Sequence, residues 1–88
     1  MNSDRPLNDY QPISCANYDQ YEIAIMHHAC LRLTWQEDNV IYDQVVTPLN
    51  LRTQGGAEYL ILRDATGAAR EVRLDHIRRM QALPAGGP

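Results

Sequence analysis

The chain of 88 residues contains no lysine and only two cysteines, Cys15 and Cys30. It has no run of about 18 apolar residues, which a membrane-spanning helix would need. Its first residues have neither the basic start nor the apolar segment of a secretory signal, so we expect a soluble cytoplasmic protein without a membrane contact. Two cysteines in a reducing compartment are more often free thiols than a bridge, and we expect no structural disulfide.

Acidic residues gather in the first half of the chain. Residues 1–43 hold seven Asp and Glu against two arginines, whereas residues 44–88 hold four acids against six arginines. A nucleic-acid binder usually shows a basic patch that neutralises phosphates. The acidic half instead favours a basic partner, and fields of this kind act mainly on association rate and selectivity.

The length suits one small domain. Residues 1–13 are polar and contain Pro6 and Pro12, which fix φ and remove backbone donors, so we expect an extended leader there. We place the folded domain at residues 14–81. Residues 82–88 end in "PAGGP", which has nothing to bury and much entropy to lose, and this composition predicts a disordered tail.

A helix is predicted over residues 17–28. Asn17 is a good N-cap with Gln20 three residues on, and acids in the first turns suit the helix dipole. Helical spacing divides the segment into two faces. The inward face is expected to hold Tyr21, Ile25 and His28. The outward face is expected to present Asn17, Tyr18, Asp19 and Glu22.

From Cys30 onward the hydrophobic period becomes two, which predicts a half-buried strand starting near Leu31. A turn at "QEDN" leads to a second strand in "VIYDQVV". The segment "TPLNLRTQGGA" is expected to be a loop because of Pro48 and the pair Gly55 and Gly56, and its residues Asn50, Arg52 and Gln54 are then free to approach a partner.

The last third of the chain predicts a hairpin. "EYLILR" and "REVRL" form its strands, and "DATG" forms its turn, in which Gly67 supplies a positive φ. The alternation slips at Asp75 and His76 and resumes at Ile77, so we expect a kink or short turn before a further strand segment.

A helix followed by four or five bent antiparallel strands predicts a mainly β fold, a small Sm-like barrel that is closed or partly open. The helix is expected to cover one open end. The interior is expected to hold Leu31, Leu33, Trp35, Leu60, Leu62, Val72 and Leu74.

The pair His27 and His28 lies near Cys30 in the sequence and, with Cys15, could be considered as a zinc site. Adjacent helical histidines project about 100° apart and rarely share one tetrahedral ion, so we expect no metal. We expect one histidine to pack at the helix end, the other to be solvated, and Cys30 to be a small buried side chain. A domain of this size has little room for a deep catalytic pocket, and we expect neither an enzyme nor a cofactor.

The strings "YQPISCANYDQYEIAIMHHACLRL", "EYLIL" and "REVRLDHI", in this order and spacing, resemble the Rof family of Rho-binding antiterminators. The resemblance covers about residues 10–80. It implies a bacterial protein with an Sm-like barrel that binds the Rho hexamer at the primary RNA-binding site in its OB-type domain. It thereby implies inhibition of Rho-dependent transcription termination, without catalysis, by a protein that is a monomer when free.

Occupying an RNA-binding groove requires groups that satisfy its arginines and lysines, and carboxylates serve this purpose. The family pattern has an acidic pair where this chain has Ala16 and Asn17. Either the remaining acids carry more of the attraction, or the contact relies on hydrogen bonding and stacking. The expected partner-binding residues are Asp9, Tyr10, Asn17, Tyr18, Asp19, Glu22, Asn50 and Arg52.

RNA binding is the alternative function, because Sm-like barrels commonly bind RNA. The candidate residues are the arginines of the second half: Arg52, Arg63, Arg70, Arg73, Arg78 and Arg79. Single-strand binders also use aromatic stacking platforms, and between these arginines the sequence offers only Tyr59. We therefore expect no direct contact with nucleic acid.

Overall fold

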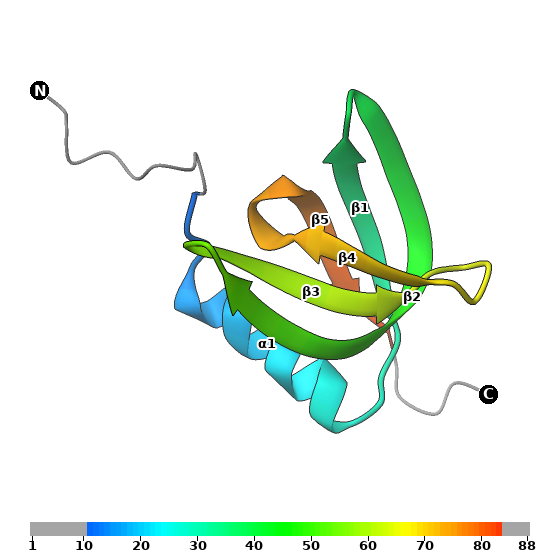
Figure 1. Cartoon of the computed structure of the whole chain (residues 1–88). Helices are drawn as coiled ribbons and strands as arrows, with labels where there is room; N and C mark the ends of the chain where they lie inside the picture. Colours follow the sequence, from blue (N-terminus) through cyan, green and yellow to red (C-terminus); the bar gives the residue numbers. More distant parts are fainter. Residues whose placement is uncertain (1–10, 84–88) are drawn as a thin grey trace, which may run out of the picture.

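The computed structural model describes residues 11–83. The expected contact residues Asp9 and Tyr10 lie outside the described residues, as does the "PAGGP" segment of the expected tail. Within the described range, one helix precedes five antiparallel strands, and a short 3-10 turn separates the last two (Figure 1). No helix in this range is both long and apolar enough to cross a bilayer.

Helix α1 spans Cys15–Met26, so the expected start at Asn17 is wrong. Ser14 is the N-cap, with φ −66° and ψ 152°, and its hydroxyl accepts a hydrogen bond from the Asn17 N–H at 3.2 Å. The Ser14 oxygen thus satisfies one of the orphan amides of the first turn, which places Asn17 inside the helix. Capping of the first turn is the physical reason for the earlier start.

The end of α1 also differs from the expectation. His27 closes the helix and His28 takes a φ of 54°, so the chain turns away before a further helical turn can form. Both histidines are exposed, and the expected inward position of His28 is wrong. Tyr21 is buried and Ile25 is half-buried against the core, as the helical spacing predicts.

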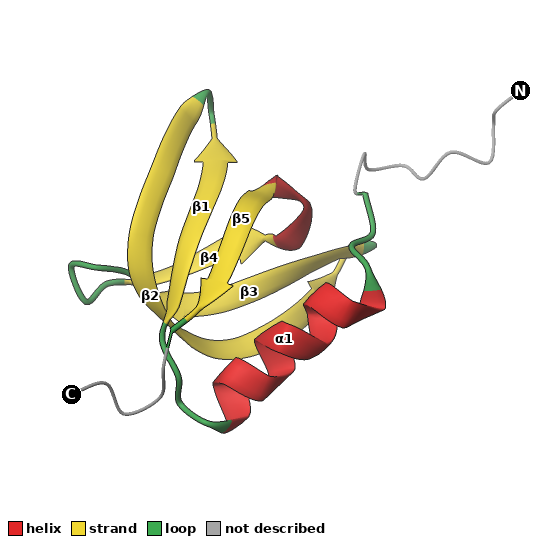
Figure 2. Cartoon of the chain, turned by 180° about the vertical axis from the view of Figure 1, so that it is seen from behind, coloured by secondary structure: helices red, strands yellow, loops and turns green. Residues whose placement is uncertain are grey.

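The five strands form one sheet in the order β4-β3-β2-β1-β5. Every neighbouring pair is antiparallel. The strands are β1 (Leu31–Glu37), β2 (Val40–Gln54), β3 (Ala57–Arg63), β4 (Ala69–Arg73) and β5 (Ile77–Ala82). The mainly β fold is confirmed, while β4 and β5 are the two edges of the described sheet, which is bent but not closed into a barrel (Figure 2).

Strand β2 is far longer than the sequence pattern predicts. Its first half pairs with β1, and from Thr47 onward it pairs with β3. The ladder to β3 shifts register between Pro48 and Asn50, which accommodates a proline without a donor. The expected loop is therefore wrong: Asn50, Arg52 and Gln54 lie in the second half of β2. Only Gly55 and Gly56 form the turn to β3.

The hairpin of β3 and β4 and the turn after it match the predictions. Gly67 has a φ of 90° in the turn between the two strands. Leu74, Asp75 and His76 form the 3-10 turn η1, which redirects the chain from β4 to β5. The expected kink at this point is confirmed.

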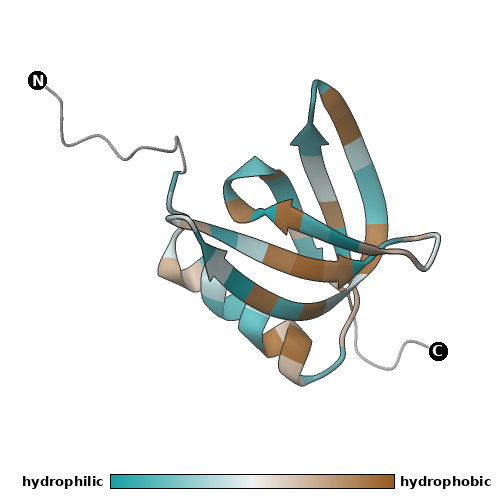
Figure 3. Cartoon of the chain, viewed as in Figure 1, coloured by the Kyte–Doolittle hydropathy of each residue, from teal (hydrophilic) through white to brown (hydrophobic). Residues whose placement is uncertain are grey.

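The core lies between the concave side of the sheet and α1, and apolar and polar residues alternate along the strands that line it (Figure 3). The seven interior residues predicted from the sequence are all buried: Leu31, Leu33, Trp35, Leu60, Leu62, Val72 and Leu74. Tyr21 and Ala24 join them from the helix, so α1 contributes its inner face to the same core. Burial of such side chains is worth about 1.5–3 kcal/mol each.

The two cysteines are free and exposed. The expected burial of Cys30 is wrong, because the residue lies in the connection between α1 and β1, one position before the buried Leu31. Successive side chains in an extended segment point to opposite sides. The Cys30 Sγ therefore faces outward and lies 3.8 Å from the Thr47 hydroxyl.

Candidate partner-binding site

The first hollow on the surface lies between α1 and the second half of β2. Its volume is about 450 Å³, and it is open to solvent. The lining residues are Tyr18, Glu22, Ile25, Met26, Asn50 and Leu51. We call it the helix–strand groove. Strand β1 pairs only with the first half of β2, so one edge of the second half of β2 has no strand from the described part of the chain beside it. Helix α1 packs along β2, and the groove lies between the two elements.

A second hollow of about 260 Å³ lies at the start of α1. Its lining residues are Ile13, Cys15, Tyr18, Asp19 and Glu58. We call it the helix-start hollow. Tyr18 belongs to both hollows and forms the wall between them. The tyrosine is thus flanked by acidic residues from two elements, α1 and β3.

This arrangement affects the titration of Tyr18. Partial burial raises the pKa of its phenol, and the negative charges of Glu58 and Glu22 raise that pKa further. A neutral phenol can donate a hydrogen bond as well as present an aromatic face. The surface therefore combines carboxylates and an aromatic ring within one small area, which suits cationic groups, and adds a hydroxyl that can donate a hydrogen bond to an acceptor.

The structure brings together four of the predicted contact residues. Tyr18, Asp19 and Glu22 lie on one side of α1, and Asn50 joins Tyr18 and Glu22 in the helix–strand groove. The Oδ1 atom of Asn50 accepts a hydrogen bond from the Leu51 N–H at 2.9 Å. This contact directs the side chain at the groove, even though the residue is in a strand rather than in the expected loop.

Two predicted contact residues lie apart from these four. Asn17 is exposed on the first turn of α1 and lines neither hollow. Arg52 forms a salt bridge with Glu71 of β4, and its guanidinium carbon lies 5.9 Å from the centroid of the Tyr59 ring. A strand position rather than a mobile loop explains why Arg52 has partners within the fold.

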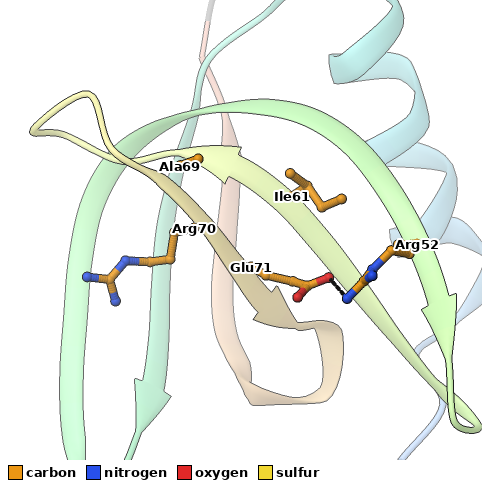
Figure 4. A pocket seen from close by; sticks show the side chains of 5 residues that line it. All are labelled: Arg52, Ile61, Ala69, Arg70 and Glu71. Atoms are coloured by element: carbon orange, nitrogen blue, oxygen red, sulfur yellow. Dashed lines mark ion pairs between the residues drawn. The ribbon is translucent and has the colours of Figure 1, made fainter.

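Arg52 lines a third hollow of about 320 Å³ with Ile61, Ala69, Arg70 and Glu71. Figure 4 shows the Arg52 and Glu71 side chains directed toward each other, while the Arg70 side chain extends away from them. The two arginines therefore do not converge on a common point. This geometry differs from that of an anion site, in which basic groups point toward one ligand.

Glu58 is a site residue that sequence reasoning missed. It is the second residue of β3 and lines the helix-start hollow opposite Asp19. The string "EYLIL" predicts a strand, but a strand pattern contains no information about which helix residue its first charged side chain approaches. The position depends on how α1 crosses the sheet, which is a tertiary property.

Five of the six arginines of the second half, all but Arg79, form side-chain hydrogen bonds or salt bridges among the described residues. Arg70 pairs with Glu37 and Asp64, and Arg73 pairs with Asp75. Arg63 donates to the Gly67 carbonyl at 3.0 Å, and Arg78 donates to the Gln36 side chain at 3.0 Å. The charges of Arg52, Arg70 and Arg73 are thus paired with carboxylates, which gives a weaker field for phosphates than the sequence count indicates.

Metal-ligating side chains do not converge anywhere within residues 11–83: no three His, Cys, Asp or Glu residues form a group that could hold an ion. His27 and His28 are both exposed, so the expectation that one histidine packs at the helix end is wrong. The turn at His28 directs both rings to solvent. The described residues thus offer no donor set for a metal cofactor.

The family model described as "Modulator of Rho-dependent transcription termination (ROF)" matches residues 12–87. The chain belongs to the Rof family. The match includes α1, all five strands and the residues of the three hollows described above, and it confirms the resemblance seen in the sequence. Members of the Rof family are described as modulators of Rho-dependent transcription termination.

Curated relatives agree with this assignment. The chain is 38% identical over 72 residues to Protein rof of Escherichia coli (strain K12), which covers 81% of each chain. Protein rof of Shigella flexneri has the same identity and coverage. These relatives are therefore similar to this chain over most of its length.

A solved structure supports the fold alone. Proteasome accessory factor B/C (PafBC) of Arthrobacter aurescens superimposes with a TM-score of 0.69 at 19% identity. The superposition covers 82% of this chain but only 12% of the PafBC chain. The same arrangement of helix and strands thus occurs as a small part of a much larger protein.

Proposed function

We propose that this chain binds the transcription termination factor Rho and inhibits Rho-dependent termination. The proposed contact is with the primary RNA-binding site in the OB-type domain of the Rho hexamer, so that RNA cannot load. The chain is a monomer when free, is located in the cytoplasm and uses no catalysis, cofactor or direct contact with nucleic acid. Membership of the Rof family supports the choice of partner.

The observation that carries the proposal is the clustering of carboxylates around Tyr18. Asp19 and Glu22 come from α1 and Glu58 comes from β3, and all three line the two hollows that share the tyrosine. A site that binds RNA presents arginines and lysines, together with surfaces on which bases stack. Carboxylates can replace phosphates in such a site, and the Tyr18 ring can replace a base.

The structure also bears on the missing acidic pair of the family pattern. Ala16 and Asn17 are exposed on the first turn of α1, so acids at these positions would extend the charged surface beyond Asp19. Glu58 of β3 lines the helix-start hollow together with Tyr18 and Asp19. We propose that Glu58, with Asp19 and Glu22, carries the attraction in this chain.

A pull-down with purified Rho tests the proposal. The full chain should retain Rho, and an excess of single-stranded RNA should release it, because both ligands compete for one site. Retention of Rho that RNA does not reduce would place the contact elsewhere on the hexamer. Absence of retention at low ionic strength, where charge attraction is strongest, would overturn the proposal.

A functional readout completes the test. In a reconstituted transcription reaction with Rho, the added chain should increase read-through at a Rho-dependent terminator and leave an intrinsic terminator unaffected. The free chain should retain no labelled RNA in a parallel assay. Strong retention of RNA by the chain alone would favour the alternative function, in which its arginines contact nucleic acid.

A further inference from the structure

The backbone of Gln11 is tied to a residue that is 64 positions away in the sequence. The Gln11 N–H donates a hydrogen bond of 3.0 Å to the Oδ2 atom of Asp75. Asp75 lies in the η1 turn, between β4 and β5. The segment before α1 is thus attached to the η1 turn, which lies near the start of the helix (Figures 1 and 2).

The carboxylate that accepts this bond is itself held in place. The side chain of Asp75 is only 6% exposed, and Arg73 binds it with two hydrogen bonds, Nε to Oδ1 at 2.9 Å and Nη2 to Oδ2 at 2.7 Å. His76 lies farther away, with 3.9 Å from its Nε2 to Oδ1. A fork of this type fixes the carboxylate plane, so that Oδ2 faces the Gln11 amide.

Three anchors then follow one another along the chain. Gln11 is bound to Asp75, Ile13 packs against the core, and the Ser14 hydroxyl caps α1. Pro12, between the first two anchors, has a φ fixed by its ring. The direction in which the chain enters α1 is therefore determined at Gln11, and Ile13 is held where it forms a wall of the helix-start hollow.

We infer that Asp75 is a positioning residue for the partner-binding surface, because its carboxylate latches the Gln11 backbone and so holds Ile13 against Tyr18 and Asp19. This inference rests on the proposed function, since it concerns the surface that is proposed to bind Rho. Asp75 acts through the backbone of the leader rather than through a contact with the partner. Loss of the bond between Gln11 and Asp75 should leave the core intact and make Ile13 less ordered at the helix-start hollow.

A pair of variants at Gln11 tests the latch with minimal disturbance. Gln11→Pro removes the N–H donor, whereas Gln11→Ala removes only the side chain and keeps the donor. Gln11→Pro should bind Rho about tenfold more weakly than Gln11→Ala, as expected for loss of one hydrogen bond to a charged group. The thermal midpoint of Gln11→Pro should lie at most a few degrees below that of Gln11→Ala, because the lost bond holds Gln11 and not the core. Equal affinities for the two variants would overturn the inference.

A double-mutant cycle separates the latch from other effects of proline. Asp75→Ala should weaken Rho binding and abolish the hydrogen-exchange protection of the Gln11 amide. Gln11→Pro added to Asp75→Ala should cause no further loss of affinity, because the bond is already absent. Additive losses would show that the two residues act separately and would overturn the latch. Measuring the thermal midpoint of Asp75→Ala identifies any part of its loss that comes from unfolding.

The same assay distinguishes failure of the latch from failure of the proposed function. The variant Asp19→Asn with Glu22→Gln serves as the reference for loss of the charged surface. If this variant loses affinity while Gln11→Pro binds Rho like Gln11→Ala, the proposed function stands and the latch is wrong. If the parent itself does not retain Rho, the proposed function fails and the role of Asp75 in binding fails with it.

Discussion

The guanidinium of Arg70 stacks over the ring of Tyr42, with 4.9 Å between the guanidinium carbon and the ring centroid. Tyr42 in turn stacks on the buried Trp35, at 5.1 Å between centroids and 10° between planes. The same guanidinium bonds Glu37 at 3.3 Å and Asp64 at 3.4 Å. Arg70, which the sequence suggests as an RNA-binding residue, thus links β4 to β1 and β2 within the fold.

Replacing Arg70 should therefore affect folding. Arg70→Ala removes the contact with the Tyr42 ring and both ion pairs, and we expect the free energy of unfolding to fall by about 1–2 kcal/mol. Arg63→Ala is the matched control, because Arg63 is exposed and should change that free energy by less than about 0.5 kcal/mol. Urea unfolding followed by Trp35 fluorescence measures both. Equal stability of the two variants would contradict this role for Arg70.

Neutralising the acids of α1 should weaken Rho binding. Asp19→Asn with Glu22→Gln preserves side-chain shape and removes two charges, and we expect a loss of affinity of about tenfold or more, since each contact that is desolvated on binding contributes strongly. The difference in affinity between parent and variant should shrink as the salt concentration is raised, because salt screens the charge attraction that only the parent has. Titration of labelled Rho at two ionic strengths measures both effects.

The control for this prediction changes net charge by the same amount elsewhere. Ala65→Lys with Gln81→Lys adds two positive charges at exposed positions in the β3–β4 turn and in β5. This variant should bind Rho nearly like the parent, as should Arg52→Ala, whose side chain pairs with Glu71. If the lysine control loses as much affinity as the neutralised variant, net charge rather than the surface around Tyr18 determines binding.

Glu58 should be detectable at Tyr18 without any partner. Burial raises the pKa of the Tyr18 phenol first, and the charge of Glu58 adds to this effect. Glu58→Gln should therefore lower that pKa toward the ordinary value of 10.0 without reaching it. An NMR titration of labelled tyrosine rings resolves Tyr18 from Tyr21, whose pKa burial raises to about 12. An unchanged pKa of Tyr18 in Glu58→Gln would show that Glu58 does not act on Tyr18.

Acid should destabilise the fold partly through Asp64. A hydrogen bond from the Thr66 hydroxyl lowers the pKa of this carboxyl, and bonds from the Thr66 and Ala68 amides and from Arg70 add to it, outweighing burial. Since the folded pKa lies below the ordinary 3.8, the stabilisation is complete above pH 3.8 and is lost as pH falls through the folded value.

The corresponding variant is Asp64→Asn. It should melt several degrees lower than the parent at pH 7, and its midpoint should fall less steeply between pH 5 and pH 2, because one linked carboxyl is gone. Thermal melts across this range provide the measurement. Parallel curves for the two proteins would show that Asp64 contributes nothing to the acid response. Burial raises the pKa of Asp75, but the hydrogen bonds from Arg73 and Gln11 lower it by more. The contribution of Asp75 to the acid response should therefore be the same in both proteins.

The fold could be predicted from local patterns wherever one face of a strand is buried. Leu31, Leu33 and Trp35 alternate with polar residues, and all three are fully buried, so period alone places them. Pro48 misled the prediction of β2. Proline usually ends a strand, but here it lies where β2 has left β1 and its ladder to β3 shifts register, and only the tertiary pairing shows this.

The site was predictable only in part. Tyr18, Asp19 and Glu22 follow from helical spacing, because residues three or four apart share a surface. Asn50 was assigned to a loop, yet it reaches the same groove because α1 packs along the edge of β2. Glu58 and the bond between Gln11 and Asp75 join residues distant in the sequence. Such pairs depend on packing, and no short motif encodes them.

The sheet order has a consequence for how the chain is assembled during synthesis. Strands β1 to β4 each pair with their neighbour in the sequence, but β5 pairs with β1, the first strand. During synthesis, β1 therefore leaves the ribosome long before β5. One edge of β1 stays unpaired while β2, β3 and β4 form. Strand β5 is the last of the five to be synthesised and it completes the sheet, so we expect native structure to form only after β5 has left the ribosome.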